Sequence, residues 1–232
     1  MTMNLETIER QTADHPQIAI IWLHGLGADG NDFVPLVDEL DLTGLPGIRF
    51  IFPHAPVMPV TINNGYKMRA WYDILGTELV ATNAESRRED ERTMRESQAL
   101  VEALIAKEKA RGIASDHIVL AGFSQGCAMT LMTGLRHPEK LGGLLCLSGY
   151  LPLQNATVAE RHAENQGTPI FLVHGAQDGV IPIARARQSH QALVEMGYSV
   201  EWHEYFMQHS LCQQEVDDIG RWLKRLFVKK TA

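Results

Sequence analysis

Short apolar runs alternate with helical patterns along most of this chain, and this alternation restricts the possible folds more than any other feature. The apolar runs have the length of buried strands, and the segments between them carry apolar residues at helical spacing. Strands that alternate with helices form a mostly parallel sheet covered by helices on both faces. We therefore expect an α/β fold whose ligands bind at the carboxyl ends of the strands.

The pattern also gives approximate bounds for each element. Strands are expected at residues 18–23, 48–52, 117–123, 143–148, 170–174 and 199–206. Helices are expected at residues 31–40, 84–110, 125–137, 183–196 and 212–227, the first of them with Asn31 as its capping residue. The 232 residues fit a single domain, 1–232, with one sizeable core.

The pentapeptide Gly122-Phe123-Ser124-Gln125-Gly126 lies between a predicted strand and a predicted helix. A serine in such a sharp turn points outward at the end of the sheet, and the two glycines let strand and helix pass closely. The N–H groups at the start of the helix favour a negative charge that forms nearby. Because Gly and Ser are common residues, the motif is weak alone, and its partners must decide whether Ser124 is a nucleophile.

A nucleophilic serine needs a base and an orienting acid, which follow it in the chain order Ser, Asp, His in doubly wound hydrolases. Asp178 lies in the turn after the strand at 170–174, and His209 follows the strand at 199–206. Both residues thus have the expected order and position, and we predict them as the acid and the base. His174 precedes the acid in the chain and is expected to support the site rather than act as its base.

The glycine-rich turn after the strand at 18–23 is a candidate for the second half of an oxyanion hole. We expect the backbone N–H groups of Leu26 and Gln125 to hold the oxyanion. A phosphate-binding loop is the alternative, but the turn has neither G-x-G-x-x-G spacing nor a P-loop lysine. The sequence arranges no ligands for a metal or an organic cofactor, so we expect none.

Residues 53–83 form a segment too long for a simple connection and too apolar for a solvated linker. Long segments of this kind in compact domains are usually functional. We interpret it as a wall of the substrate pocket, with Met68, Trp71 and Leu75 as candidate substrate-binding residues. The alternative is that the segment only closes one edge of the sheet.

Composition narrows the classes of partner. A net charge of −7 argues against nucleic acid or an anionic membrane as the main partner, since both require a basic surface. No run is long enough to span a membrane, and the N-terminal residues lack the apolar core of a signal peptide. Three scattered cysteines suit a reducing compartment, so we expect a cytoplasmic protein. The oligomeric state is not readable, and a homodimer stays open.

With these residues assembled, the chain resembles the phospholipase/carboxylesterase family, which includes acyl-protein thioesterases. The resemblance runs almost end to end and rests on HGLGADG at 24–30, PHAP at 53–56, WYD at 71–73, GFSQG at 122–126, and HG at 174–175 followed by Asp178 and IP at 181–182. It implies an α/β-hydrolase fold without a large lid domain. It also implies a triad at Ser124, Asp178 and His209, with oxyanion donors at Leu26 and Gln125.

The chain departs from the family pattern at two positions. The family usually has a second glycine after GFSQG, where this chain has Cys127, and a glycine before the base, where this chain has Gln208. Neither change removes a catalytic atom. Gln208 requires a non-glycine backbone beside the base and bears on the shape of that loop.

Three functions are consistent with these residues. The first is a serine carboxylesterase that hydrolyses esters of short-to-medium acyl chains through an acyl-enzyme, acting on a small-molecule ester or an acylated substrate. The second is an acyl-protein thioesterase or lysophospholipase with the same triad. The third is a non-catalytic binding protein on a hydrolase fold, which the retention of the whole predicted triad disfavours.

Overall fold

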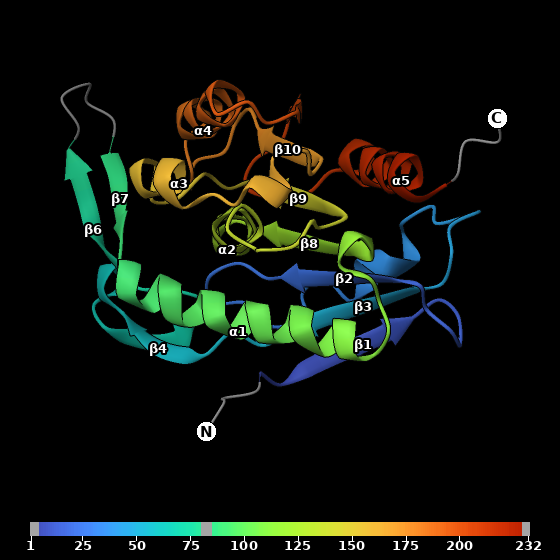
Figure 1. Cartoon of the computed structure of the whole chain (residues 1–232). Coiled ribbons are helices and arrows are strands. Elements are labelled where there is room, and N and C mark those ends of the chain that lie inside the picture. The colour runs from blue at the N-terminus through green and yellow to red at the C-terminus, as the bar shows by residue number, and fades with distance from the viewer. Residues whose placement is uncertain (1–4, 80–84, 229–232) are drawn as a thin grey trace.

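The computed structural model describes residues 5–79 and 85–228, and a sheet of seven strands lies at its centre (Figure 1). The strand order is β1-β3-β2-β8-β9-β10-β11; β1 pairs antiparallel with β3 at one edge, and the other pairs are parallel. The strands are β1 (Thr7–Gln11), β2 (Ile18–Leu23), β3 (Ile48–Pro53), β8 (Ile118–Phe123), β9 (Gly143–Leu147), β10 (Ile170–Gly175) and β11 (Val200–Tyr205). The predicted mostly parallel sheet is confirmed.

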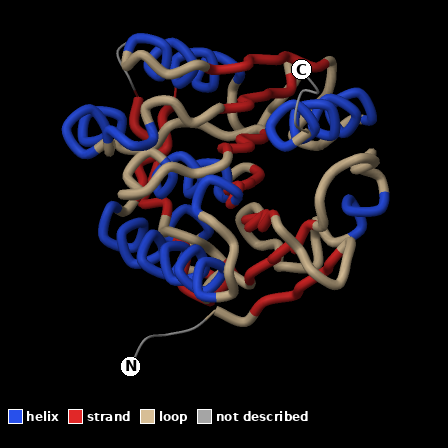
Figure 2. Tube along the Cα trace, turned by 45° about the vertical axis from the view of Figure 1, so that its right-hand side comes forward, coloured by secondary structure: helices blue, strands red, loops and turns tan. Residues whose placement is uncertain are grey.

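Helices cover both faces of this sheet (Figure 2). They are α1 (Glu91–Ala110), α2 (Gln125–Gly134), α3 (Gln154–Glu160), α4 (Ile183–Glu195) and α5 (Gln213–Phe227), with short 3-10 turns at Pro35–Asp38, Thr61–Asn63, Ser115–His117 and Ala163–Asn165. Among the residues that the structure describes, no helix is long and apolar enough to span a membrane.

The two faces bury two separate apolar clusters, because successive side chains of a strand point to opposite faces. Ile21 of β2 packs with apolar residues of α1, α2 and α4, whereas its neighbours Ile20 and Trp22 pack with the Pro35–Asp38 turn and α5. The central strands are buried on both faces, which explains why they read as continuous apolar runs.

The helix expected at 31–40 is wrong. These residues form turns and the short 3-10 segment Pro35–Asp38. A helix that began after Asn31 would place the ring of Pro35 against a carbonyl of its own first turn. Instead of capping a helix, the Asn31 amide groups donate to Asp29 Oδ1, at 2.7 Å from the backbone nitrogen and 3.0 Å from the side chain.

The helix expected at 84–110 begins later, at Glu91, because Asp90 is its N-terminal cap and accepts a hydrogen bond from the Thr93 N–H at 3.2 Å. Residues before the cap form β7 (Glu85–Glu89), which pairs with β6 (Ile74–Leu79). Ala84 lies outside the described residues. The pairing with β6 overrides the helical pattern of this charged segment.

Residues 53–79, the described part of the segment expected at 53–83, are more regular than expected. Val57–Val60 (β4) and Tyr66–Arg69 (β5) form an antiparallel hairpin, and β6 starts the second hairpin (Figure 1). Asn64 and Gly65 turn the first hairpin with φ of 55° and 74°, so the Asn-Gly pair was a readable hairpin signal. The sequence interpretation also missed β1 and α3. Within the described residues there is no large lid domain.

The close crossing of β2, β8 and α2 predicts that Gly126→Ala is severely destabilising. A Cβ atom at this position would lie 2.1 Å from the Leu23 carbonyl oxygen and 2.6 Å from its carbon. Because backbone atoms cannot move aside cheaply, we expect a loss of about 3 kcal/mol or more in the free energy of unfolding, measured with urea. Gly167→Ala is the matched control, since a Cβ there meets nothing within 4 Å; an equal effect of both variants would contradict this account.

The buried acid Glu215 predicts a second, pH-dependent effect on stability. The side chain is fully buried in the first turn of α5, and burial raises its pKa to about 8, with Asp218 adding to the shift and the Cys212 backbone opposing it. The folded protein thus holds a proton that the unfolded chain releases above about pH 4.5, so stability falls as pH rises from about 4.5 to 8.

The Glu215→Gln variant has no ionisable group at this position. We therefore expect its free energy of unfolding to lack the decrease with rising pH that Glu215 causes. Relative to the wild type, its free energy of unfolding should improve by roughly 2–4 kcal/mol between pH 5 and pH 8. Urea unfolding at the two pH values measures the difference, with the exposed Asp217→Asn on the same helix as control. The same effect of Glu215→Gln at both pH values would contradict the assignment.

Candidate active site

Ser124 occupies the turn between β8 and α2 in a conformation that side chains rarely adopt, with φ of 56° and ψ of −116°. The turn is held by the Ser124 N–H, which donates to the Leu147 carbonyl of β9 at 2.9 Å, and by the close contact of Gly126 with β2. Strained backbone of this kind costs of order 1–3 kcal/mol and persists only where its surroundings enforce it. The consequence here is a serine hydroxyl fixed at the carboxyl end of the sheet.

The structure brings Ser124, His209 and Asp178 into one hydrogen-bonded row. His209 Nε2 lies 2.9 Å from Ser124 Oγ, and His209 Nδ1 lies 2.6 Å from Asp178 Oδ2. Since a carboxylate can only accept, the proton of a neutral His209 belongs on Nδ1. Nε2 is then free to accept the hydroxyl proton of Ser124, as a general base must.

Asp178 is surrounded by donors that favour its ionised form. Its Oδ1 accepts the backbone N–H groups of Val180 and Ile181, each at 2.8 Å, and Oδ2 lies 3.2 Å from His174 Nε2. Burial alone would raise the pKa of Asp178, but hydrogen bonds from His174, His209 and Ile181 outweigh it and hold the pKa well below its usual range. Asp178 is therefore a carboxylate at neutral pH.

The expected supporting position of His174 has a clear geometry. The ring is fully buried at the end of β10, and its Nε2 donates to the Ile181 carbonyl at 2.8 Å. This bond ties the turn that carries Asp178 back to the strand before it.

The loop that carries His209 is fixed against the end of β10. The Gln177 N–H donates to the Met207 carbonyl at 3.0 Å, and a Cβ at Gly175 would lie 2.3 Å from the Gln208 carbonyl oxygen. Gln208 itself is exposed and is not among the described non-glycine residues with positive φ. The loop therefore holds His209 without a left-handed residue at the position where glycine is usual.

The predicted oxyanion turn lies beside Ser124. A Cβ at Gly25 would lie 3.4 Å from the Ser124 Cβ, and Leu26 follows as a half-buried residue. Gln125 is the first residue of α2, and its side-chain amide is engaged elsewhere, with the Trp71 N–H and the Tyr72 carbonyl, each at 2.7 Å. The backbone N–H of Gln125 is thus the group of this residue that can face an oxyanion.

His24 supports this turn and was not singled out from the sequence. Its Nδ1 donates to the Gly25 carbonyl at 2.7 Å, and its Nε2 accepts the Ala55 N–H at 3.1 Å. Burial lowers the pKa of His24 to about 4, so the ring is neutral at pH 7 and keeps this pair of bonds. The HG dipeptide before the predicted oxyanion residue was the available signal.

The three candidate substrate-binding residues take different positions. Met68 is half-buried, and its sulfur would lie 3.7 Å from a Cβ at Gly27, so it packs along the oxyanion turn. Leu75 is 37% exposed on β6. Trp71 has no exposed surface, and its indole N–H donates to the His24 carbonyl at 2.9 Å. Trp71 therefore lies beneath the turn in a supporting position, because its ring is enclosed by core residues.

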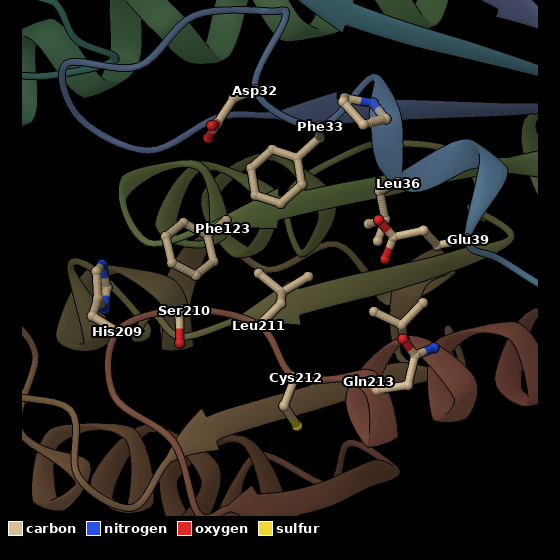
Figure 3. A pocket seen from close by; sticks show the side chains of 12 residues that line it. Asp32, Phe33, Leu36, Glu39, Phe123, His209, Ser210, Leu211, Cys212 and Gln213 are labelled. Atoms are coloured by element: carbon tan, nitrogen blue, oxygen red, sulfur yellow. The ribbon is translucent and has the colours of Figure 1, made fainter.

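A cavity of about 420 Å³ adjoins His209 on a side that the sequence interpretation did not predict (Figure 3). Its apolar lining comes from two segments, 32–39 and 209–216, and comprises Phe33, Pro35, Leu36, Leu211, Cys212 and Val216, together with Phe123 of β8. Because a helix was predicted at 31–40, the sequence analysis did not identify residues 32–39 as part of a cavity wall. None of Met68, Trp71 and Leu75 is among the residues that line it.

The three cysteines do not form disulfides in this structure. Cys127 and Cys146 are buried, Cys212 is half-buried, and all three are free. Cys127 packs so closely under Gly149 that a Cβ there would lie 2.5 Å from its sulfur, so the variation after GFSQG is accommodated in the core. Within the described part of the chain, no group of three or more His, Cys, Asp or Glu side chains is arranged to hold a metal ion.

Comparison with known proteins relates this chain to esterases and thioesterases. The sequence model of the Phospholipase/Carboxylesterase family matches residues 3–227. An acyl-protein thioesterase 1 of Yarrowia lipolytica is 39% identical over 209 residues, covering 88% of this chain and 90% of the relative. Carboxylesterase SOBER1 of Arabidopsis thaliana is 33% identical over 213 residues, covering 89% of each chain.

Solved structures agree with this relationship. The crystal structure of Arabidopsis thaliana SOBER1 matches with a TM-score of 0.83 and 32% identity, covering 90% of this chain and 98% of the other. The crystal structure of Zea mays acyl-protein thioesterase 2 matches with a TM-score of 0.81 and 28% identity, covering 95% of this chain and 98% of the other. The chain therefore belongs to the phospholipase/carboxylesterase family and is an α/β-hydrolase that cleaves esters or thioesters.

Proposed function

We propose that Ser124, His209 and Asp178 form the catalytic triad of a serine carboxylesterase. One observation carries this proposal: Ser124, His209 and the ionised Asp178 are joined by two hydrogen bonds. The first, between Ser124 Oγ and His209 Nε2, is 2.9 Å long, and the second, between His209 Nδ1 and Asp178 Oδ2, is 2.6 Å long. His209 takes the hydroxyl proton as Ser124 Oγ attacks the carbonyl carbon. Asp178 orients the ring and stabilises its protonated form.

The oxyanion of the tetrahedral intermediate is held by the backbone N–H groups of Leu26 and Gln125. The positions of these two residues support this assignment. Gln125 is the first residue of α2, directly after the nucleophile, and Leu26 follows Gly25, which packs against Ser124. The start of α2 adds the positive end of a helix dipole. Preorganised donors of this kind often contribute more to catalysis than any other term.

The acyl-enzyme forms when the tetrahedral intermediate collapses. The carbon–oxygen bond of the ester breaks, its electron pair stays on the leaving oxygen, and His209 Nε2 returns its proton to that atom. Water then attacks the acyl-enzyme with His209 as base, which releases the acid and restores Ser124. Carboxylic esters with short-to-medium acyl chains are the substrates we propose, in the cytoplasm.

Thioester hydrolysis is the second candidate, favoured by the naming of several relatives as acyl-protein thioesterases. The same atoms perform it, with sulfur in place of oxygen as the leaving atom. Initial rates with esters and thioesters of matched acyl length separate the two functions. A kcat/KM at least tenfold higher for thioesters across all lengths would contradict the esterase proposal and support the thioesterase.

Ser124→Ala is expected to lower kcat for a chromogenic ester by at least about 10⁴-fold, because it removes the attacking atom and leaves the turn intact. It should also abolish covalent labelling by a fluorophosphonate. A stopped assay and a labelling gel measure both quantities.

Ser148→Ala is the matched control, since Ser148 is also a buried serine at positive φ at the end of a neighbouring strand. It should keep both activity and labelling. Labelling that persists in Ser124→Ala, or disappears in Ser148→Ala alone, would contradict the assignment of Ser124.

A further inference from the structure

The cavity between the 32–39 and 209–216 segments has no role in the triad chemistry described above. We propose that it is the leaving-group subsite and that it accepts an apolar alcohol or thiol that is neutral or positively charged. The proposal rests on the function proposed for Ser124 and His209. The cavity volume of about 420 Å³ lies within the range of small-molecule binding sites.

The position of the cavity follows from the path of the proton. His209 Nε2 must reach the leaving oxygen or sulfur when the tetrahedral intermediate collapses, so the leaving group lies next to the His209 ring. His209 is itself part of the cavity wall, whereas Gly25 and Leu26 of the predicted oxyanion turn are not. Ser124 does not line it either, so the cavity adjoins the base rather than the oxyanion turn, and this is the region that we assign to the leaving group.

Part of the wall is apolar, and a row of rings holds this part in place. Trp22 stacks on Phe33 with centroids 5.3 Å apart, Phe33 lies 5.7 Å from Phe123, and Phe123 lies 4.8 Å from the His209 ring. Leu211 faces these rings from the loop after His209 (Figure 3). A preformed apolar wall favours carbon-rich groups, because their burial removes apolar surface from water.

The carboxylate side chains that line the cavity, Asp32 and Glu39, are both acidic. Asp32 and Glu39 line it and are exposed, and of the 12 lining residues none is Lys or Arg. Two carboxylates next to two aromatic rings attract a cation and repel an anion. A leaving group that carries a phosphate or carboxylate would thus be disfavoured, whereas a quaternary ammonium would be accepted.

The size of the subsite is tested with esters that share one acyl group. Methyl and hexyl butyrate give the same acyl-enzyme, so the ratio of their kcat/KM values reports the leaving group alone. Leu211→Trp narrows the cavity and should lower the hexyl-to-methyl ratio at least about tenfold. Leu211→Ala widens the cavity and should raise the kcat/KM for the bulkier cyclohexylmethyl butyrate relative to that for methyl butyrate. Val194→Trp, at an exposed position on α4, is the matched control.

The charge preference is tested with an isosteric pair, butyrylcholine and 3,3-dimethylbutyl butyrate. Asp32→Asn combined with Glu39→Gln should lower the choline-to-dimethylbutyl ratio of kcat/KM about fivefold and leave the hexyl-to-methyl ratio as in the wild type. This decrease in the choline-to-dimethylbutyl ratio should be smaller at high salt, since salt screens exposed charges.

The outcomes separate this proposal from the one it rests on. If the wild type is neither labelled by a fluorophosphonate nor active on any of these esters, the triad function fails. If it is labelled and active but both Leu211 variants keep the wild-type ratios while folded, as judged by unfolding temperature, the leaving-group subsite is overturned. An unchanged choline-to-dimethylbutyl ratio in the double variant overturns the charge preference.

Discussion

The strained turn at Ser124 is the constraint on which the rest of the site depends. A φ of 56° is held by the crossing of α2 over the end of β2, where Gly126 leaves no room for a side chain beside the Leu23 carbonyl. This crossing fixes the serine, starts α2 directly after it and sets Gly25 against the serine Cβ. The geometry of the proposed nucleophile and of both proposed oxyanion donors thus follows from one close backbone contact.

The acid and the base are positioned by a different set of contacts, between the ends of β10 and β11. The Gln177 N–H and Met207 carbonyl join the two loops, and His174 anchors the turn of Asp178 from within the core. The catalytic geometry is therefore built from neighbouring strand ends rather than from one continuous segment. Met68 packs along the oxyanion turn, whereas the cavity is lined by His209 and does not include Met68.

Much of this arrangement was predictable because it depends on strong local signals. Buried parallel strands read as apolar runs, and the positions of Ser124, Asp178 and His209 after β8, β10 and β11 predicted that the three residues lie close together. What failed depended on longer-range or competing effects. Pro35 prevents the helix expected at 31–40, and pairing with β6 takes residues 85–89 out of the expected helix. The cavity could not be predicted because its walls come from segments about 180 residues apart in the chain, which come together on one face of the sheet only in the folded protein.

Trp71 illustrates the limit of reading chemistry from composition. An aromatic residue in an apolar loop suggested substrate contact, yet its bonds to His24 and Gln125 make it part of the support beneath the turn. Burial of a large side chain depends on the whole fold, and the local sequence does not specify it. The same holds for Phe33, whose ring is fixed by Trp22 from β2.

The most direct test of the account is peptide mapping by mass spectrometry after acid quenching of the protein in turnover with a chromogenic aryl ester. The account predicts the added mass of one acyl group on Ser124, formed together with a burst of about one equivalent of the released phenol. Acylation of another residue, or steady turnover after a burst with Ser124 unmodified, would contradict it.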